Sequence, residues 1–120
     1  MTHRTFRVKR TYAEPARGDG LRVLVERLWP RGQTRAQVAA EAWLRELAPS
    51  PGLRRWFDHR PERWKGFLER YHAELAAHPE AWAPLLEAIE KRPVTLLYSA
   101  RDEAHNAAIA LASFLEAQRA

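Results

Sequence analysis

The sequence predicts a small α/β domain built on a mostly parallel sheet of about three to four strands. Two segments are predicted to be strands. Leu21–Leu28 begins with an apolar, β-branched run of Leu21, Val23, Leu24 and Val25, and Val94–Tyr98 is a continuous apolar run of strand length, which is typical of a strand buried inside a sheet. Elsewhere apolar residues recur at intervals of three and four, the spacing that places them on one side of a helix. Together these patterns favour helices packed on the faces of a small sheet.

The N-terminal part is predicted to begin with a strand in Phe6–Tyr12, where apolar and basic residues alternate as in a strand with one covered face. This pattern suggests a position at or near the edge of the sheet. The loop Glu14–Gly20 is too short to hold a crossover helix, so the pairing direction of the first two strands stays open. Pro30 ends the second strand because it cannot continue a hydrogen-bonded ladder, and Gly32 permits a tight turn.

A helix is predicted from Thr34 to about Leu47. Thr34 and Gln37 match a capping box, in which each side chain bonds the backbone amide of the other residue. Glu41 and Arg45 are spaced to pair on the outer side of this helix. The residues expected to be buried are Ala40, Trp43, Leu44 and Leu47.

Two helices are predicted in the middle of the chain. Ser50 before Pro51 is typical of an N-cap followed by proline at the first helical position, and the short helical turn after it ends near His59. Pro61 opens a longer helix that His78–Pro79 closes. The apolar stripe of this longer helix consists of Trp64, Phe67, Leu68, Tyr71 and Leu75.

The next segment, Glu80–Arg92, is predicted to be helical only from about Pro84 onwards, because a proline inside a helix costs about 3 kcal/mol. Its apolar side consists of Trp82, Leu85, Leu86 and Ile89. Val94–Tyr98 should be a central buried strand, and Asp102 is a good N-cap for the last helix. That helix is expected to bury Ala104, Ala108, Leu111, Ala112 and Leu115. The prediction is thus a single domain over residues 1–120 with a three-layer, Rossmann-like arrangement.

The composition limits the classes of function. Twenty basic against fifteen acidic residues give a net charge of +5, which favours an anionic partner such as nucleic acid, a nucleotide or a phosphorylated metabolite. The alternative is that the arginines form solvated helix faces. The absence of cysteine excludes disulfides, thiolate metal sites and a cysteine nucleophile. With no apolar signal region and no membrane-length apolar run, we expect a cytoplasmic protein without a membrane partner.

A ligand site is predicted where two strands end. In α/β sheets ligands bind outside the carboxyl ends of the strands, and both ends open on one rim if the two strands are parallel neighbours. Arginine guanidinium groups at this rim can bind a phosphate or carboxylate, and an indole can stack on a ring attached to it. The candidate ligand-binding residues are Arg27, Trp29, Arg31, Ser99, Arg101 and Asn106. The alternative is that Trp29 belongs to the core, that Arg27 pairs with Glu26 or Asp102, and that Asn106 only ties the loop.

Asp102 and His105 are the candidate catalytic residues. They are three positions apart, so their side chains can meet and act as an acid–base pair with His105 as the proton carrier. Asp102 could equally be only a helix cap. Ser99 could act as a nucleophile, but no nucleophile-elbow glycines flank it. The histidines lack metal-ligand spacing and no glycine-rich phosphate loop opens a helix, so no metal or cofactor is predicted.

A basic and aromatic segment provides the rival hypothesis of nucleic-acid binding. Stacked aromatic rings next to phosphate-binding arginines are how single strands are held. Here the residues would be Arg54, Arg55, Trp56, His59, Arg60 and Arg63. The alternative is that Trp56 and Phe57 cover the core while the arginines are solvated.

Four stretches resemble, in order and over nearly the whole chain, the short, YeaO-like branch of the domain-of-unknown-function family 488. They are RVLVERLWPRG, AWLRELAPSPGLRRWF, PERWKGFLERYHAEL and PVTLLYSARDEAHNAA. The resemblance implies a small α/β fold and no established biochemistry. Members usually carry aspartate where this chain has Glu26 and an acidic residue where it has Arg60. If those acids are catalytic in the family, Arg60 argues against the same activity here.

Overall fold

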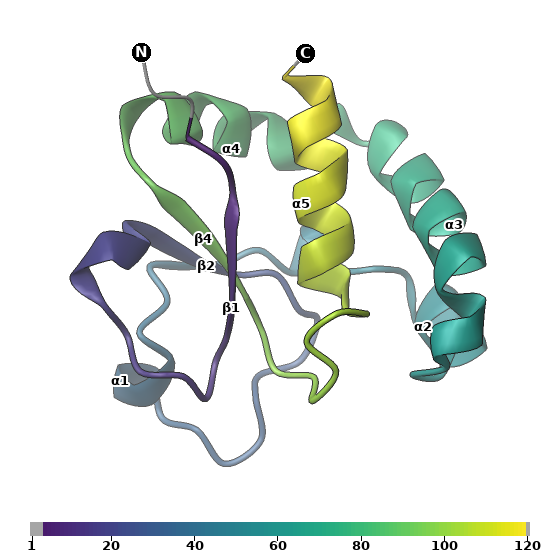
Figure 1. Cartoon of the computed structure of the whole chain (residues 1–120), viewed down its shortest axis with the longest axis horizontal. Coiled ribbons are helices and arrows are strands. Elements are labelled where there is room, and N and C mark those ends of the chain that lie inside the picture. Colours follow the sequence, from purple (N-terminus) through teal and green to yellow (C-terminus); the bar gives the residue numbers. More distant parts are fainter. Residues whose placement is uncertain (1–3, 120) are drawn as a thin grey trace.

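The computed structural model describes residues 4–119, in which four strands form one parallel sheet in the order β1-β4-β2-β3 (Figure 1). The strands are β1 (Arg7–Arg10), β2 (Leu21–Leu24), β3 (Ala42–Trp43) and β4 (Val94–Tyr98). The predicted α/β class is therefore confirmed. The pairing direction that the sequence left open is parallel, because β1 and β2 both pair with β4, one on each side. The predicted edge position of the first strand is also confirmed.

Five α-helices connect and cover these strands. They are α1 (Arg35–Val38), α2 (Pro51–Phe57), α3 (Trp64–Ala76), α4 (Pro79–Lys91) and α5 (Ala107–Gln118). Short 3₁₀ turns lie at Arg17–Asp19, Arg45–Leu47 and Pro61–Arg63. None of the helices in residues 4–119 combines the length and the apolarity that crossing a membrane requires.

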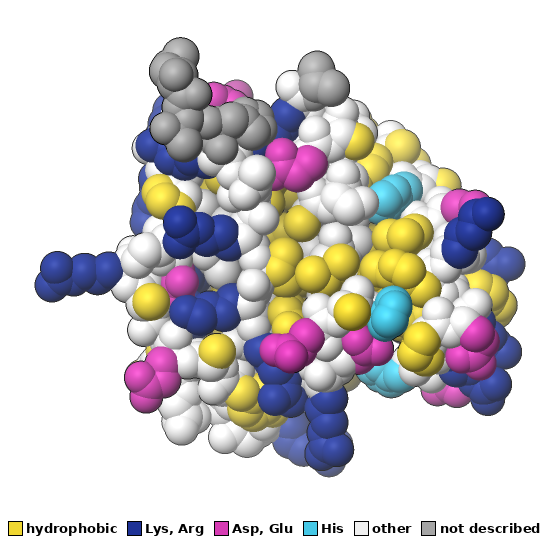
Figure 2. Space-filling model, in the orientation of Figure 1, with side chains coloured by type: hydrophobic (Ala, Val, Ile, Leu, Met, Phe, Trp, Pro, Cys, Tyr) yellow, Lys and Arg dark blue, Asp and Glu magenta, His cyan; other side chains and the backbone are white. Residues whose placement is uncertain are grey.

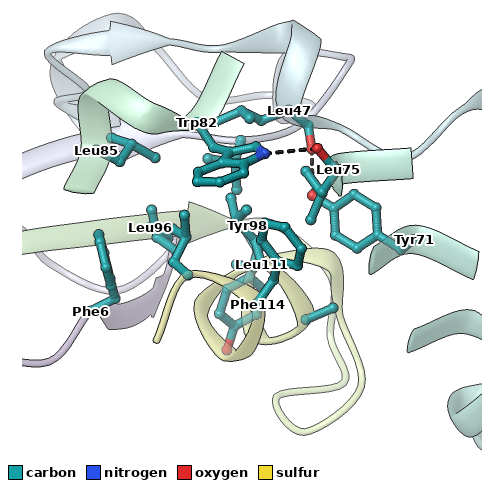
Figure 3. Packing of buried hydrophobic residues seen from close by; sticks show 14 of the residues in the cluster. Phe6, Leu47, Tyr71, Leu75, Trp82, Leu85, Leu96, Tyr98, Leu111 and Phe114 are labelled. Atoms are coloured by element: carbon teal, nitrogen blue, oxygen red, sulfur yellow. Dashed lines mark hydrogen bonds between the residues drawn. The ribbon is translucent and has the colours of Figure 1, made fainter. Parts of the chain in front are cut away.

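The two faces of the sheet are covered to different extents. Successive residues of a strand point to opposite faces, and Val23 and Leu24 of β2 accordingly belong to two different apolar clusters. The larger cluster lies between the sheet and α3, α4 and α5; Figure 3 shows Trp82 of α4, Leu96 of β4 and Phe114 of α5 gathered in it. The smaller cluster lies on the other face and is closed by α1 and by two half-buried indoles. The predicted layers of helices are thus present, with most of the helical mass on one face.

All five residues of β4 are buried, as predicted for a central strand. The apolar stripe of α3 is confirmed, since Phe67, Tyr71 and Leu75 are buried and Figure 3 shows Tyr71 bonded to the carbonyl of Leu47. The predicted N-cap of α2 is confirmed as well, because Ser50 accepts a hydrogen bond from the amide of Leu53. These elements were predictable because residues close to one another in the sequence determine them.

The helix predicted from Thr34 to Leu47 is wrong beyond its first turn. The capping box of Thr34 and Gln37 forms, with hydrogen bonds of 2.8 and 3.1 Å, but α1 ends at Val38 and Ala39 turns into the left-handed region at φ 50°. Arg22 of β2 donates to the carbonyls of Val38 at 2.6 Å and Ala39 at 3.0 Å. Because these carbonyls are the acceptors that a longer helix would use, the guanidinium of Arg22 replaces the continuation of α1.

The chain then pairs with β2 as the short strand β3 instead of continuing as a helix. The predicted pair of Glu41 and Arg45 is therefore wrong. Glu41 forms an ion pair with Arg92 at 2.9 Å, and Arg45 lies over the ring of Trp43 at 3.8 Å. Of the residues expected to be buried in that helix, Leu47 is buried and Ala40, Trp43 and Leu44 are half-buried.

Two further helix boundaries differ from the prediction. No break occurs at Pro84, and α4 begins at Pro79. Pro84 and Glu80 are both exposed, so water can satisfy the carbonyl of Glu80 that loses its amide partner. The last helix begins at Ala107 rather than near Asp102, because Asn106 is its N-cap.

The residue predicted to be buried at the start of the last helix, Ala104, lies before α5 and is exposed. Ala108, Leu111 and Leu115 are buried as expected, and Ala112 is half-buried. The turn before α5 instead carries two hydrogen bonds to Asp102, from the amides of Ala104 at 2.9 Å and His105 at 3.0 Å.

The second strand is also shorter than predicted, since β2 ends at Leu24 and not at Leu28. One more ladder contact follows, from the amide of Val25 to the carbonyl of Leu97 at 3.4 Å. Beyond it the chain leaves the sheet, and Leu28 is 67% exposed. The segment from Glu26 onwards is therefore a loop at the carboxyl end of the sheet.

Candidate functional site

The carboxyl ends of β2 and β4 lie side by side. Leu24 of β2 pairs with Leu97 of β4, so the loops that follow these two strands leave the sheet at the same edge. A hollow of about 580 Å³ opens there. It is lined by residues from three segments, 25–31, 48–59 and 99–107, and by Phe67 of α3, and we call it the strand-end pocket. The predicted juxtaposition of the two strand ends is confirmed.

The strand-end pocket contains most of the side chains that the sequence singled out at this edge. The predicted residues that line it are Arg27, Trp29, Arg31, Ser99, His105 and Asn106. Arg101 is exposed and Asp102 is half-buried, and neither lines the pocket. Asp102 is connected to the pocket through its hydrogen bond to His105, which lines the pocket.

The segment around α2 adds basic side chains that the sequence placed on a separate surface. Arg54, Arg55 and His59 line the strand-end pocket. Among the described residues, the pocket lining therefore combines four arginines, two from the loop after β2 and two from α2, with two carboxylates, Glu26 and Asp58. The excess of positive over negative side chains in the lining produces a potential that attracts anions.

The remaining members of the predicted nucleic-acid surface lie outside this pocket. The ring of Trp56 is covered by the guanidinium of Arg70 at 3.9 Å, and Arg63 lies 5.4 Å from the ring centre. Arg60 lies 3.5 Å from the carboxylate of Asp58. Trp56 is thus half-buried among cations rather than presented as an open stacking platform.

The loop after β2 is held in place by hydrogen bonds from aromatic and amide side chains. The indole of Trp43 donates to the carbonyl of Glu26 at 2.6 Å, and that of Trp29 donates to the carbonyl of Gln33 at 2.7 Å. Gln33 in turn donates to the carbonyl of Thr11, beyond the end of β1, at 3.0 Å. The two indole rings meet edge to face with centres 5.4 Å apart. The wall of the pocket is therefore pre-formed, and Trp29 contributes mainly to its support.

The loop after β4 is anchored in the same way. Arg10 of β1 donates from Nε to the carbonyls of Ser99 at 3.3 Å and Ala100 at 3.0 Å. Asn106 accepts from the amide of Ile109 at 2.9 Å and donates to the carbonyl of Asp102 at 3.0 Å. Both polar ends of the Asn106 side chain are used inside the protein, which favours the alternative that this residue ties the loop.

Glu26 is the acidic side chain that sequence reasoning left out of the site. Its Oε2 accepts a hydrogen bond from the hydroxyl of Ser99 at 3.1 Å, whereas its Oε1 is buried and has no partner in the part of the chain that the structure describes. Burial raises the pKa of Glu26, and the hydrogen bonds from Ser99 and the charges of Arg54 and His59 oppose this rise only in part. The sequence did contain a signal for placing Glu26 in the site, because this acidic residue directly follows a buried strand and lies next to the basic loop.

Arg27 does not form the pair that the alternative reading of the sequence allowed. It makes no ion pair with Glu26 or with Asp102, and its Nε is buried without a partner among residues 4–119. Buried guanidinium nitrogens are costly to leave unsatisfied. This unsatisfied nitrogen is therefore a cost to the folded state, while Arg27 as a whole contributes its charge to the lining of the pocket.

His105 and Asp102 meet as predicted. The Nδ1 of His105 lies 2.9 Å from Oδ2 of Asp102, and the ring of Trp64 contacts the imidazole edge to face with centres 5.2 Å apart. The amide of Ala104, and after it the His105 side chain, hold the pKa of Asp102 below its usual value. With Nδ1 engaged by a carboxylate, Nε2 is the nitrogen that can bond a ligand or carry a proton.

Backbone strain is concentrated in the pocket lining. Asp58 and His59 both have positive φ angles, of 48° and 53°. Two consecutive side-chain-bearing residues in this region cost about 1–3 kcal/mol each and persist only where the surroundings impose them. This turn, which directly follows α2, directs the chain so that both residues line the pocket.

Comparison with known proteins identifies relatives over nearly the whole chain. The uncharacterised protein YeaO of Escherichia coli is 41% identical over 107 residues, which are 89% of this chain and 93% of the relative. The uncharacterised proteins Rv3073c of Mycobacterium tuberculosis and Mb3100c of Mycobacterium bovis are each 38% identical over 109 residues, 91% of this chain and 92% of theirs. No solved structure matches. A family model described as "Inactive DUF488-N3 subclade" matches residues 5–120, and the chain therefore belongs to this family, as the resemblance of its motifs indicated.

Proposed function

We propose that the protein binds a small anion, a phosphate or a carboxylate, in the strand-end pocket, and that it binds this ligand without converting it. The observation that carries the proposal is the charge of the lining, four arginines against two carboxylates at adjacent strand ends. Arginine presents a planar fork that matches phosphate and carboxylate groups, so several of them around one hollow select for an anion.

The first turn of α5 adds to this field. Ala107, the first residue of the helix, lines the pocket, so the positive end of the helix dipole lies at the same hollow as the arginines. The pocket is also within the usual volume range of sites for small molecules, about 300–1,000 Å³. Both features support a small ligand rather than a macromolecule at this edge.

Binding without conversion is proposed because of the family description. The subclade is described as inactive, and the chain carries Arg60 where the resemblance led us to expect an acid. The acid–base role of His105 and Asp102 stays a prediction, and in the present proposal their pair serves to orient the imidazole toward the ligand. The cytoplasm as the location of the protein also stays a prediction.

A thermal-shift panel of phosphorylated and carboxylated metabolites tests the proposal. A ligand at a concentration one hundred times its Kd stabilises the folded state by about 2.7 kcal/mol, which raises the Tm by several degrees. Arg54→Ala and Arg31→Ala should each weaken the shift. Arg17→Ala is the matched control, because Arg17 is an exposed arginine that precedes β2 and thus lies at the opposite end of the strands. If no anion shifts the wild-type protein, the proposal is wrong.

Nucleic-acid binding is the second candidate, and one observation favours it: Arg54, Arg55 and Arg60 are all exposed along one segment. The covered ring of Trp56 counts against a stacking platform. Filter binding across salt concentrations separates the candidates, because binding through many phosphate contacts weakens steeply as salt rises. Tight, salt-sensitive retention of a single-stranded oligonucleotide would favour this candidate over a small anion.

A further inference from the structure

We infer that the imidazole of His59 contacts the ligand of the strand-end pocket directly and donates a hydrogen bond to its anionic group. The inference rests on the proposed function and adds to it a binding residue from the turn that follows α2. Three observations carry it: the backbone conformation of His59, the position of its side chain, and a ring that has no other partner among residues 4–119.

The first observation concerns the turn formed by residues 57–60. The amide of Arg60 donates to the carbonyl of Phe57 at 3.0 Å, and the two residues between them, Asp58 and His59, both have positive φ angles. Turns closed in this way with two positive φ angles are dominated by Asn, Asp and Gly, and Gly is the usual residue at the second central position. His59 occupies that second position.

Asp58 has a reason for its conformation that His59 lacks. The amide of Asp58 donates to the carbonyl of Arg54 at 3.0 Å, and a left-handed residue of this kind commonly ends a helix. His59 follows this cap, and glycine in its place would take the same backbone path without strain. Side-chain-bearing residues held in such conformations cluster at active sites and ligand clamps. The imidazole at this position therefore points to binding rather than to stability.

The second observation concerns the position of the side chain. His59 is exposed and lines the strand-end pocket. A charge on its ring, like the charge of Arg54, lowers the pKa of Glu26, which lies two positions after the end of β2. Such an effect requires that the side chains lie close together, because charges near the surface are screened over about 10 Å. The imidazole therefore lies at the strand end, where the arginines of the pocket also gather.

The third observation concerns partners within the protein. The rings of His72, His78 and His105 each have a nitrogen within 3.5 Å of an oxygen of another residue. The ring of His59 has no hydrogen bond and no ion pair in the described part of the chain. An imidazole always carries at least one N–H donor. In a pocket that attracts anions, this unused donor is free to bond the anionic group of the ligand.

Phosphoenolpyruvate is a suitable probe, because it carries both anionic groups that the proposed function names, a phosphate and a carboxylate. Isothermal titration at constant ionic strength gives its affinity for the full chain. We expect His59→Asn to weaken the binding at least about tenfold, since a hydrogen bond to a charged group contributes on this scale. Asparagine tolerates the left-handed region, so this change removes the imidazole and keeps the backbone of the turn.

Asp58→Asn is the matched control, because it makes the same kind of change one position earlier in the turn. It removes a carboxylate from the pocket lining, so phosphoenolpyruvate should bind this variant at least as tightly as the wild-type protein. His59→Gly separates stability from binding. It should resist urea at least as well as the wild-type protein, because glycine adopts a positive φ without strain, while its affinity falls as in His59→Asn.

NMR spectroscopy provides a readout of the contact itself. The ring resonances of His59 are assigned by their absence from the spectrum of His59→Asn. They should shift when phosphoenolpyruvate saturates the wild-type protein. Those of His72, whose ring bonds the carbonyl of Ala110 in α5 and does not line the pocket, should stay in place.

The outcomes are distinct. Unchanged affinity of both His59 variants, or His59 resonances that do not move, overturn the inference and leave the anion pocket standing. Equal losses in His59→Asn and Asp58→Asn also overturn it, because they assign the loss to the turn and not to the imidazole. If another anion of the thermal-shift panel binds and phosphoenolpyruvate does not, the inference alone fails. If no anion of the panel shifts the wild-type protein, the proposed function and the inference fail together.

Discussion

The hydroxyl of Ser99 donates a hydrogen bond to Oε2 of Glu26 over 3.1 Å and thereby joins the ends of β4 and β2. These residues are 73 positions apart in the sequence. Burial raises the pKa of the Glu26 carboxyl above its ordinary value. The folded protein therefore takes up a proton on Glu26 at a higher pH than the unfolded chain does, and this difference makes its stability depend on pH.

Glu26→Gln should become more stable relative to the wild-type protein as pH rises. Between the ordinary pKa of glutamate and the raised one, the folded state binds more protons than the unfolded state, so the wild-type free energy of unfolding falls as pH increases through that window. Glutamine does not titrate. Urea denaturation of both proteins at about pH 4 and about pH 8 measures the change. Glu87→Gln, at an exposed position of α4, is the control, and an equal difference at both pH values would contradict the prediction.

Arg22→Ala should cost about 3 kcal/mol or more of stability. Arg22 and Asp19 are both buried and form an ion pair at 2.5 Å, and Arg22 also satisfies the carbonyls of Val38 and Ala39. Removing the guanidinium leaves a buried carboxylate whose remaining cationic partner among the described residues is Lys9, at 3.0 Å. Urea denaturation gives the loss, and Arg17→Ala should stay within about 0.5 kcal/mol of wild type. Equal effects of the two changes would mean that the buried pair contributes nothing.

Gly20→Ala should destabilise the protein much more than Gly32→Ala. Both glycines have positive φ angles, of 64° and 76°, so alanine is strained at either position by about 1–2 kcal/mol. At Gly20 a Cβ would also lie 2.1 Å from the carbonyl oxygen of Pro93, whereas at Gly32 nothing lies within 4 Å. Gly20 also has ψ −130°, which with its positive φ is a combination that residues with a Cβ rarely adopt. The difference in the free energies of unfolding therefore contains this backbone strain as well as the clash, and we expect it to exceed about 1–3 kcal/mol.

Asn106→Ala should be more destabilising than Asp102→Ala. Asn106 caps α5 through the amide of Ile109, and loss of such a cap costs about 1–2 kcal/mol. The side chain of Asp102 instead accepts from two amides of the turn before the helix and contacts the ring of His105. Thermal or urea unfolding of the two variants ranks them. The opposite order would restore Asp102 as the residue that starts the last helix.

Patterns within short stretches of sequence correctly predicted the elements that those stretches determine by themselves. The proline after Ser50, the stripe of Phe67, Tyr71 and Leu75, and the apolar run of β4 all appear in the structure as the sequence indicated. The capping box at Thr34 was also correct. The length of α1 was not predictable from that segment, because Arg22, 16 residues from Val38, takes the carbonyl that helix extension needs.

The candidate site shows the same division between local and distant causes. The two strand ends were predicted to meet because parallel neighbours end at one edge, and they do. Nothing in the sequence indicated that α2 would bring Arg54, Arg55 and His59 to that edge, since their placement follows from how α2 packs on α3. From the sequence alone, Glu26 is considered only as a possible partner of Arg27 and as a departure from the family pattern, and it is not placed in the site. Its burial and its bond to Ser99 depend on a residue far along the chain.

Figure 2 shows that Lys and Arg side chains lie mostly around the margin of the face seen there, including its lower edge, where the strands in Figure 1 end. Hydrophobic side chains gather at its centre, over and beside α5. The Lys and Arg side chains are thus distributed unevenly over this face, and some of them lie near the strand ends.

The position of β4 has a consequence for the order of events on the ribosome. β1 and β2 are made first, yet each pairs with β4, whose residues emerge more than 70 positions later than Leu21. Until Val94–Tyr98 leaves the exit tunnel, the nascent N-terminal strands lack the neighbour that holds them together. The complete four-stranded sheet therefore cannot form before β4 is available, and a nascent chain stalled before Val94 lacks the strand that joins β1 to β2.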